Sequence, residues 1–163
     1  MTIRAVPMTE AHLPGFYEVA KAEEPFAEQL APTLAHFRAT IQGAGGLEGF
    51  ALLNSEDEVV GGVTFTAHVP LVDVLIHAVV SKRIRGRWLS RDVLASVFEH
   101  VFVTLELPRV SAYSIPGLNH ESEHALIKMG FRLEGVKQCA SLLPDGYHDV
   151  WLYGMLRASC PWI

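Results

Sequence analysis

Basic side chains are concentrated in one short stretch of the sequence. Five of the 13 Lys and Arg residues fall between positions 82 and 91, although the formal net charge of the chain is −5. A cluster this local fits one anionic ligand, whereas nucleic acid needs a broad basic surface. We therefore expect a compact anion site and regard a nucleic-acid partner as disfavoured. The five residues are Lys82, Arg83, Arg85, Arg87 and Arg91.

The segments on either side of this cluster indicate how it would bind a ligand. Residues 71–80 are almost continuously Val, Leu and Ile, which is typical of a strand buried on both faces. In residues 88–106 apolar side chains recur every three or four positions, which predicts a long amphipathic helix. A helix N-terminus attracts phosphate, and Gly86 would let the backbone approach the ligand. A solvated basic loop has the same composition, so the pattern alone leaves both interpretations open.

The rest of the chain predicts one α/β (α+β) domain over residues 1–163. A strand is expected at 2–7, helices at 9–21 and 25–42, and a hairpin from 47–53 and 59–69. A strand at 109–115, a helix at 119–129 and strands at 131–142 and 149–156 follow. This order predicts a mixed sheet with helices packed on it. In the second helix the expected apolar stripe is Leu30, Leu34, Phe37 and Ile41.

Composition excludes several classes of protein. No window reaches the roughly 20 apolar residues of a membrane span, and no apolar segment follows a basic start at the N-terminus. We expect a cytoplasmic protein with no membrane partner. Cys139 and Cys160 lie far apart without a C-x-x-C pattern, so free thiols and no metal site are expected.

Several motifs resemble those of the GCN5-related N-acetyltransferase (GNAT) superfamily. Residues 83–86 (RIRG) resemble the first four positions of its Arg/Gln-x-x-Gly-x-Gly/Ala pyrophosphate loop. Residues 119–122 (NHES) and 128–135 (KMGFRLEG) resemble the N-x-x-S and K-x-G-F-x-x-E-G signature of the branch related to ribosomal-protein N-terminal acetyltransferases. Residues 145–149 (DGYHD) are similar to the turn before the last strand of that branch.

The resemblance implies a GNAT fold, with a mixed, mostly antiparallel sheet of about seven strands and about four flanking helices. It also implies acetyl-CoA as the cosubstrate. Trp88 departs from the family pattern, which has Gly or Ala there. Its bulk would obstruct the pyrophosphate, or its side chain would turn into the core and leave its N–H free; we expect binding. The implied cofactor-binding residues are Ala78, Val79, Val80, Arg83, Arg85, Gly86, Arg87, Trp88, Asn119 and Ser122.

Acetyl transfer to an amine needs a base, a donor at the thioester carbonyl and a proton for the leaving thiolate. The resemblance implies that backbone groups of residues 78–80 polarise the carbonyl. By alternation Asp73 and His77 share one face of the strand, with His77 nearer the expected thioester. His77 is the candidate catalytic base or water relay, because imidazole titrates near neutral pH. A buried neutral histidine bonded to a neighbouring strand is the alternative, and Asp73 is interpreted as a strand-edge carboxylate.

The resemblance implies Ser122 as the catalytic proton donor, with capping of its helix as the alternative. Asn119 would contact pantetheine and also cap that helix. Many family members carry a Tyr in this helix, but no Tyr lies between residues 119 and 130. Tyr113 is a reserve acid, or a packing residue of its strand.

The resemblance implies that the acceptor amine binds between the first two helices and the loop that joins the last two strands. Residues 143–148 of this loop would contribute Tyr147 or His148. A protein N-terminus, a lysine, a polyamine and a small amine all remain open. Acidic residues in the first region would favour a cationic amine, or form a solvated face. They are Glu18, Glu23, Glu24 and Glu28.

The expected function is an N-acetyltransferase in which the amine attacks acetyl-CoA directly in a ternary complex. The alternative is a CoA-binding or interaction protein of the same fold without turnover, which Trp88 and the missing Tyr would support. A protein acting on charged tRNA is disfavoured by the acidic balance. The apolar segment 151–163 suggests a homodimer, or packs back on its own sheet.

Overall fold

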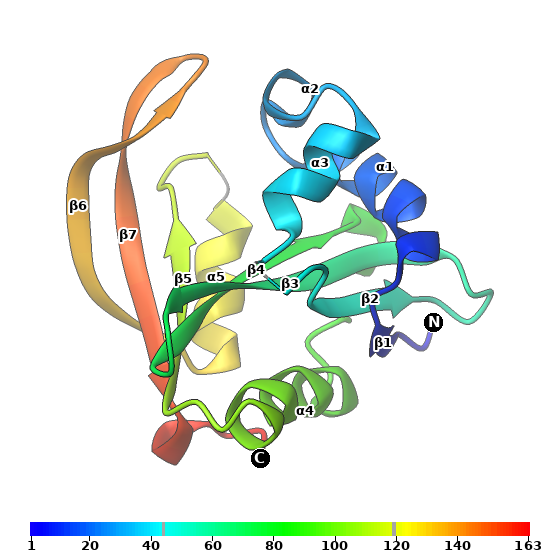
Figure 1. Ribbon diagram of the computed structural model, residues 1–163, viewed down its shortest axis with the longest axis vertical. Helices are drawn as coiled ribbons and strands as arrows, with labels where there is room; N and C mark the ends of the chain where they lie inside the picture. The colour runs from blue at the N-terminus through cyan, green and yellow to red at the C-terminus, as the bar shows by residue number, and fades with distance from the viewer. Residues whose placement is uncertain (44, 119) are drawn as a thin grey trace.

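The computed structural model describes residues 1–43, 45–118 and 120–163 (Figure 1). Seven strands form one sheet in the order β1-β2-β3-β4-β5-β7-β6. Neighbouring strands run antiparallel except β4 and β5, which are parallel. The predicted mixed, mostly antiparallel sheet is confirmed. The strands are β1 (Arg4–Pro7), β2 (Gly49–Leu53), β3 (Val59–Val69), β4 (Asp73–Val80), β5 (Arg109–Ser114), β6 (Arg132–Leu143) and β7 (Gly146–Leu156).

The two parallel strands pair over a short distance only. Their register ends with Leu75 opposite Ser111, after three residue pairs. Beyond this point β4 remains paired with β3, and β5 remains paired with β7. The two strands therefore diverge, and we call the opening between residues 76–80 and 112–114 the strand fork.

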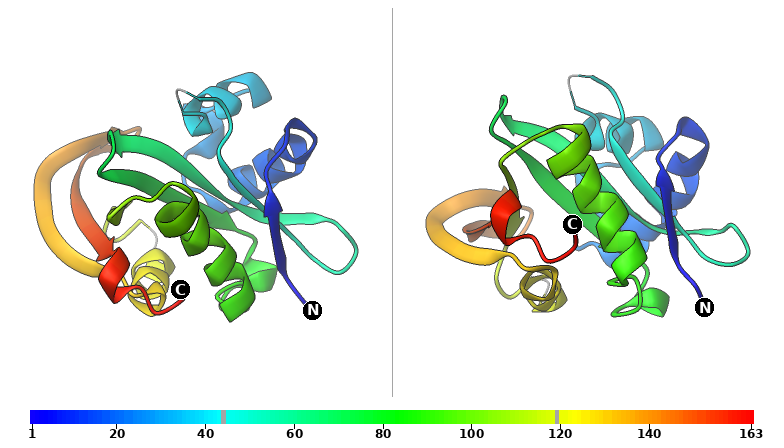
Figure 2. Two further views of the ribbon diagram at one scale, coloured as in Figure 1. Left: turned by 60° about the horizontal axis from the view of Figure 1, so that its bottom comes forward. Right: turned by 90° about the horizontal axis from the view of Figure 1, so that it is seen from below.

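Helices cover both faces of the sheet. Helices α4 and α5 pack on one face, in the main core, against Ile76 of β4 and Ala112 of β5 (Figure 2). Helices α1 and α3 pack on the other face, against Val79 of β4. In Figure 1 the β6–β7 hairpin curls at the left edge of the sheet, away from α1–α3. The α-helices among the described residues are α1 (Leu13–Glu23), α2 (Ala27–Leu30), α3 (Leu34–Ile41), α4 (Arg91–Glu99) and α5 (His120–Met129).

The predicted helix at 25–42 is two helices, so five α-helices rather than about four are described. The break follows from Pro32, which disfavours helical backbone in the residue before it. Thr33 then starts α3, because its hydroxyl accepts a hydrogen bond from the backbone N–H of His36. The predicted apolar stripe is wrong in its first half. Phe37 and Ile41 are buried, but Leu30 and Leu34 are 53% and 37% exposed.

The long helix predicted at 88–106 starts later than expected. Ser90 is its N-cap and accepts from the N–H of Val93, so α4 begins at Arg91. After Glu99 the helix continues as a π-helix over His100–Thr104. The loop between β4 and α4 is therefore longer than predicted, and it contains a short 3₁₀ turn at Lys82–Ile84.

The strand predicted at 71–80 is not buried along its whole length. Leu71 lies in the turn before β4 and is 90% exposed. Near the other end, half of the His77 side chain is exposed, because the fork removes the neighbouring strand on that side. The prediction of a strand buried on both faces is wrong at this position.

Candidate active site

A cavity of about 690 Å³ lies at the strand fork. Its walls are residues 76–80 of β4, residues 112–115 at the end of β5, part of α5, the loop before α4, and the inner side of β6–β7. The end of α1 contributes Glu23 and Glu24. The predicted residues Ala78, Val79 and Val80 therefore lie together on one wall.

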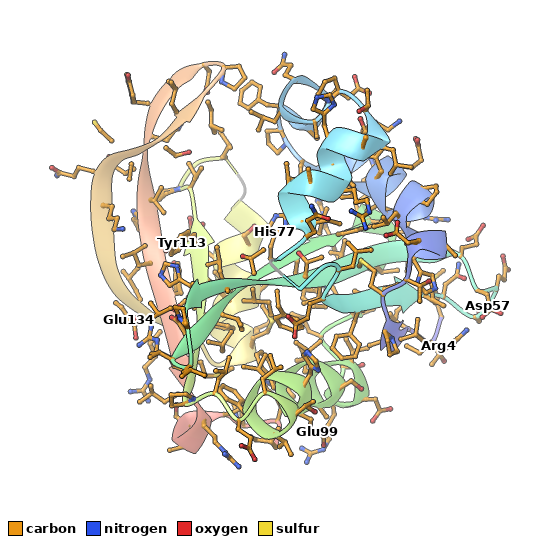
Figure 3. All side chains as sticks on the ribbon, viewed as in Figure 1. Arg4, Asp57, His77, Glu99, Tyr113 and Glu134 are labelled. Atoms are coloured by element: carbon orange, nitrogen blue, oxygen red, sulfur yellow. The ribbon has the colours of Figure 1, made fainter. Side chains whose placement is uncertain are left out.

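His77, labelled in Figure 3, forms a pair with Glu24, and both residues line the cavity. The Nε2 atom of His77 lies 2.8 Å from Oε1 of Glu24, the residue that follows α1. The expected alternative, a buried histidine bonded to a neighbouring strand, is wrong. The imidazole is half exposed, and its partner comes from a helix rather than from a strand.

Two opposing effects act on the imidazole of His77. Desolvation by the surrounding protein lowers the pKa of His77, whereas the hydrogen bond and negative charge of Glu24 raise it. The net shift of the His77 pKa is upward. At neutral pH the protonated fraction of His77 is therefore larger than that of a free histidine. A higher pH is needed before the imidazole is neutral and can accept a proton.

The loop before α4 presents Arg85 and Gly86 to the cavity. Gly86 has a φ of 77°, a left-handed conformation that favours glycine, and a Cβ built on it would meet no atom within 4 Å. The open space beyond Gly86 fits the close approach of a phosphate group. The Nη2 atom of Arg85 lies 3.0 Å from Oε2 of Glu23, and Oε1 of the same carboxylate accepts from the backbone N–H of Lys82.

Trp88 is buried in the main core, with 5% of its surface exposed, and it also contributes to the cavity wall. The indole is thus accommodated among core side chains, which agrees with the expectation that this side chain turns into the core. The expectation of a free Trp88 N–H is wrong. This N–H donates to the carbonyl oxygen of Ile84 at 3.2 Å, as does that of Arg87 at 2.9 Å, because the loop forms a tight turn.

Two of the predicted phosphate-binding arginines do not line the cavity. The side chain of Arg83 is 58% exposed, and its Nη2 atom lies 3.9 Å from Oε2 of Glu58. Arg87 is also exposed. Neither residue is among those that line the cavity. Their charges can act on an anion at the loop only from outside the cavity wall.

Ser122, in the first turn of α5, lies on the cavity wall. Asn119 lies outside the described residues. Gly130 ends α5 as predicted, with a φ of 104°. Tyr113 of β5 lines the cavity as well, and its hydroxyl lies 3.0 Å from Nε2 of His68 on β3.

Asp73 is more than a strand-edge carboxylate. Its side chain is 4% exposed and joins the bases of β4 and β5, because Oδ2 accepts from the Ser111 hydroxyl at 2.5 Å and from Nε of Arg109 at 3.3 Å. Arg109 also donates to Glu134 of β6, at 2.6 Å. This buried network ties three strands together at the closed end of the fork.

Only some of the residues predicted to bind the acceptor line the cavity. Leu143 lines the cavity at the end of β6. Tyr147 is 72% exposed and is not on the wall, and His148 bonds to Asp145 at 2.7 Å instead. Of the four predicted glutamates, Glu23 and Glu24 reach the cavity, while Glu18 pairs with Lys21.

Sequence reasoning missed the pairing of Glu24 with His77, and it missed His68, Arg109 and Lys137 as residues near the site. The partners lie on different elements, 53 residues apart for Glu24 and His77. Alternation placed His77 on the correct face of β4, but no local signal connects it with α1.

Other features concern metals, membranes and assembly. The described residues contain no group of three or more His, Cys, Asp or Glu side chains that could hold a metal ion. None of the helices in the described part of the chain has both the length and the apolar character needed to cross a bilayer.

Near the C-terminus, Nε1 of Trp162 donates to the carbonyl oxygen of Met129, so this segment packs on its own chain.

The fold is that of the GNAT acetyltransferases, which are its structural neighbours. No protein-family model matches the sequence, and no curated protein does. A solved structure assigned as an acetyltransferase is similar at 25% identity and a TM-score of 0.72, over 97% of this chain and 84% of that one.

Two neighbours have more specific names. The spermidine/spermine N-acetyltransferase SpeG from Vibrio cholerae, in mutant form, is 14% identical over 96% of this chain and 95% of its own, with a TM-score of 0.73. A ribosomal-protein-S5-alanine acetyltransferase from Vibrio fischeri is 16% identical over 99% and 94%, with a TM-score of 0.67. The predicted resemblance to GNAT enzymes, including the ribosomal-protein branch, is confirmed at the level of the fold.

Proposed function

We propose that this chain is an acetyl-CoA-dependent N-acetyltransferase whose acceptor is an amine. The observation that carries the proposal is the strand fork: β4 and β5 separate after three residue pairs, and a cavity fills the gap. A strand edge with free backbone groups is suited to an extended amide-containing arm, because such an arm can pair with it as a strand would. The loop around Gly86 and the N-terminus of α4 would hold the phosphates.

The residues of the cavity have separate roles in this proposal. When bound, acetyl-CoA supplies a thioester, and backbone groups of residues 78–80 polarise its carbonyl. His77 accepts the proton of the acceptor nitrogen, directly or through water, as the C–N bond forms. Ser122 donates a proton to the sulfur as the C–S bond breaks. Glu24 orients the imidazole of His77 and stabilises its protonated form.

Acetyl-CoA binding tests the first half of the proposal. We expect saturable binding in calorimetry, abolished in Gly86→Glu, where a carboxylate would occupy the space beyond Gly86. Gly117→Glu is the matched control, because Gly117 has a similar φ of 82°, also faces open space and does not line the cavity. Equal binding by the wild type and Gly86→Glu would contradict the placement of the phosphates.

Release of CoA thiol with a panel of amines tests the second half. Turnover with any primary amine supports an N-acetyltransferase. Binding of acetyl-CoA without turnover of any amine would instead support the alternative of a CoA-binding protein that lacks activity. The buried position of Trp88 weakens that alternative, because its indole packs among core side chains.

A further inference from the structure

A second cavity continues the first on the sheet face that carries α1 and α3. Its volume is about 270 Å³, and it shares Tyr113, Lys137 and Leu152 with the cavity at the fork. The end of β3 contributes His68 and Val69 to its lining, and the turn before β4 contributes Val72. The combined space extends from the His77–Glu24 pair, past Tyr113, to the middle of β6.

The strand register places His77, Tyr113 and Lys137 on this one face. His77 and Tyr113 each lie two positions beyond the last β4–β5 pair, Leu75 and Ser111. Tyr113 is opposite Leu152, which is opposite Gly135, and Lys137 lies two positions beyond Gly135 on β6. The three side chains thus surround one space from three strands.

The carboxylates of this space already have basic partners. Among the described residues, four line the two cavities, and each has a partner. Glu23 pairs with Arg85, and Glu24 pairs with His77. Asp73 and Glu134 both pair with Arg109. None of these four carboxylates is left without a basic partner, although Asp73 and Glu134 share one guanidinium group, whereas the glutamate-rich sequence favoured a free acidic cluster.

Lys137 differs from these residues. It lines both cavities, and none of the described residues makes an ion pair or a hydrogen bond with its side chain. Lys128 also lacks such a partner, but it lies on α5, on the wall assigned to the cofactor. Among the described residues on the acceptor side, Lys137 is therefore a cationic side chain that no carboxylate pairs with. The neighbouring Tyr113 and His68 add neutral polar groups.

We propose that the acceptor is a primary amine that also carries a carboxylate, and that Lys137 binds this carboxylate while His77 faces the amine. The proposal rests on the N-acetyltransferase function proposed above and narrows its substrate class. A charge-assisted hydrogen bond between ammonium and carboxylate fixes the orientation of the acceptor. An amine of the spermidine type, with no anionic group, would place a second cation beside Lys137.

The experiment compares acceptors that differ only in the carboxylate. Acetylation rates are measured for phenylalanine against phenylethylamine, for lysine against cadaverine, and for spermidine. The same amino acids are titrated by calorimetry into protein saturated with CoA, which reports binding without turnover. Wild type is compared with Lys137→Met, with Lys137→Arg, and with Arg132→Met as a control that removes a cation of β6 outside both cavities.

We expect the carboxylated member of at least one pair to have the higher kcat/KM. Lys137→Met should reduce that preference about 10- to 100-fold, the range of a charged hydrogen bond, while Lys137→Arg retains most of it and Arg132→Met all of it. Higher rates with spermidine or the decarboxylated amines, or an undiminished preference in Lys137→Met, would overturn the assignment and leave the acetyltransferase proposal standing. If no amine is acetylated and none binds, both proposals fail.

Discussion

Glu24 Oε1 lies 2.8 Å from His77 Nε2, so the carboxylate that follows α1 favours the protonated form of an imidazole on the cavity wall. Because Glu24 raises the pKa of His77, we expect the acidic limb of the kcat/KM profile to move to lower pH in Glu24→Gln. NMR titration of the His77 ring would report the same shift independently of activity.

The pair also links stability to pH. A histidine whose pKa is raised on folding stabilises the fold fully below its unfolded pKa of about 6.5, and this contribution is lost as the pH rises through the folded value. Glu24→Gln should therefore reduce stability more at pH 5.5 than at pH 8. Glu28→Gln, which changes an exposed glutamate outside the cavity, is the control and should change neither profile.

Ser122 and Tyr113 can be separated as proton donors. If Ser122 protonates the leaving thiolate, Ser122→Ala should lower kcat about 100-fold or more, with little change in the affinity for acetyl-CoA. Tyr113→Phe, which removes a hydroxyl bonded to His68, should then lower kcat only a few-fold. The opposite order of effects would assign the acid to Tyr113.

The buried Asp73 network should contribute more to stability than a surface pair. Asp73→Asn removes the charge that Arg109 faces and weakens two hydrogen bonds, so we expect a loss of about 1–3 kcal/mol in the free energy of unfolding. Asp57→Asn is the control, because Asp57 pairs with Arg4 at an exposed position and should cost less than about 1 kcal/mol. Similar midpoints in urea denaturation for the two variants would contradict this difference.

Trp88 should act through the core rather than through the cofactor. Trp88→Ala is expected to reduce the free energy of unfolding by about 3–5 kcal/mol, the usual cost of truncating a buried aromatic side chain. It should not tighten acetyl-CoA binding. Phe102→Ala, another buried residue of the same core, gives the cost of truncation away from the cavity. Tighter binding in Trp88→Ala alone would mean that the indole obstructs the site.

Local signals predicted most of the elements. The turn residues between β2 and β3, the three-to-four spacing of α4 and the stop at Gly130 all depend on residues close in sequence, and each element is found near its predicted place. The errors are also local in origin. Pro32 breaks the predicted second helix before Thr33 starts α3, and Ser90 caps α4 two residues after the predicted start at Trp88.

The geometry of the site was less predictable, because it depends on contacts between distant segments. Alternation on β4 identified His77, but the exposure of its side chain follows from the divergence of β4 and β5, which no pattern in either strand reveals. The same holds for Asp73 and Arg109, which meet because the first residues of β4 and β5 are paired. The loop motif predicts a phosphate contact for Arg83, Arg85 and Gly86 alike. In the fold only Arg85 and Gly86 line the cavity.

The short pairing of β4 with β5 has a consequence for how the molecule holds together. Hydrogen-bond continuity across the sheet is interrupted, and β1–β4 are joined to β5–β7 by three residue pairs, the Asp73 network, the Tyr113–His68 contact and the shared core. A ligand lying in the fork would take the place of the missing strand pairing, so binding should couple two halves that otherwise fluctuate more independently. Backbone amides of residues 76–80 and 112–114 that face the gap should then exchange with deuterium more slowly once acetyl-CoA is bound, while those between β2 and β3 remain unchanged.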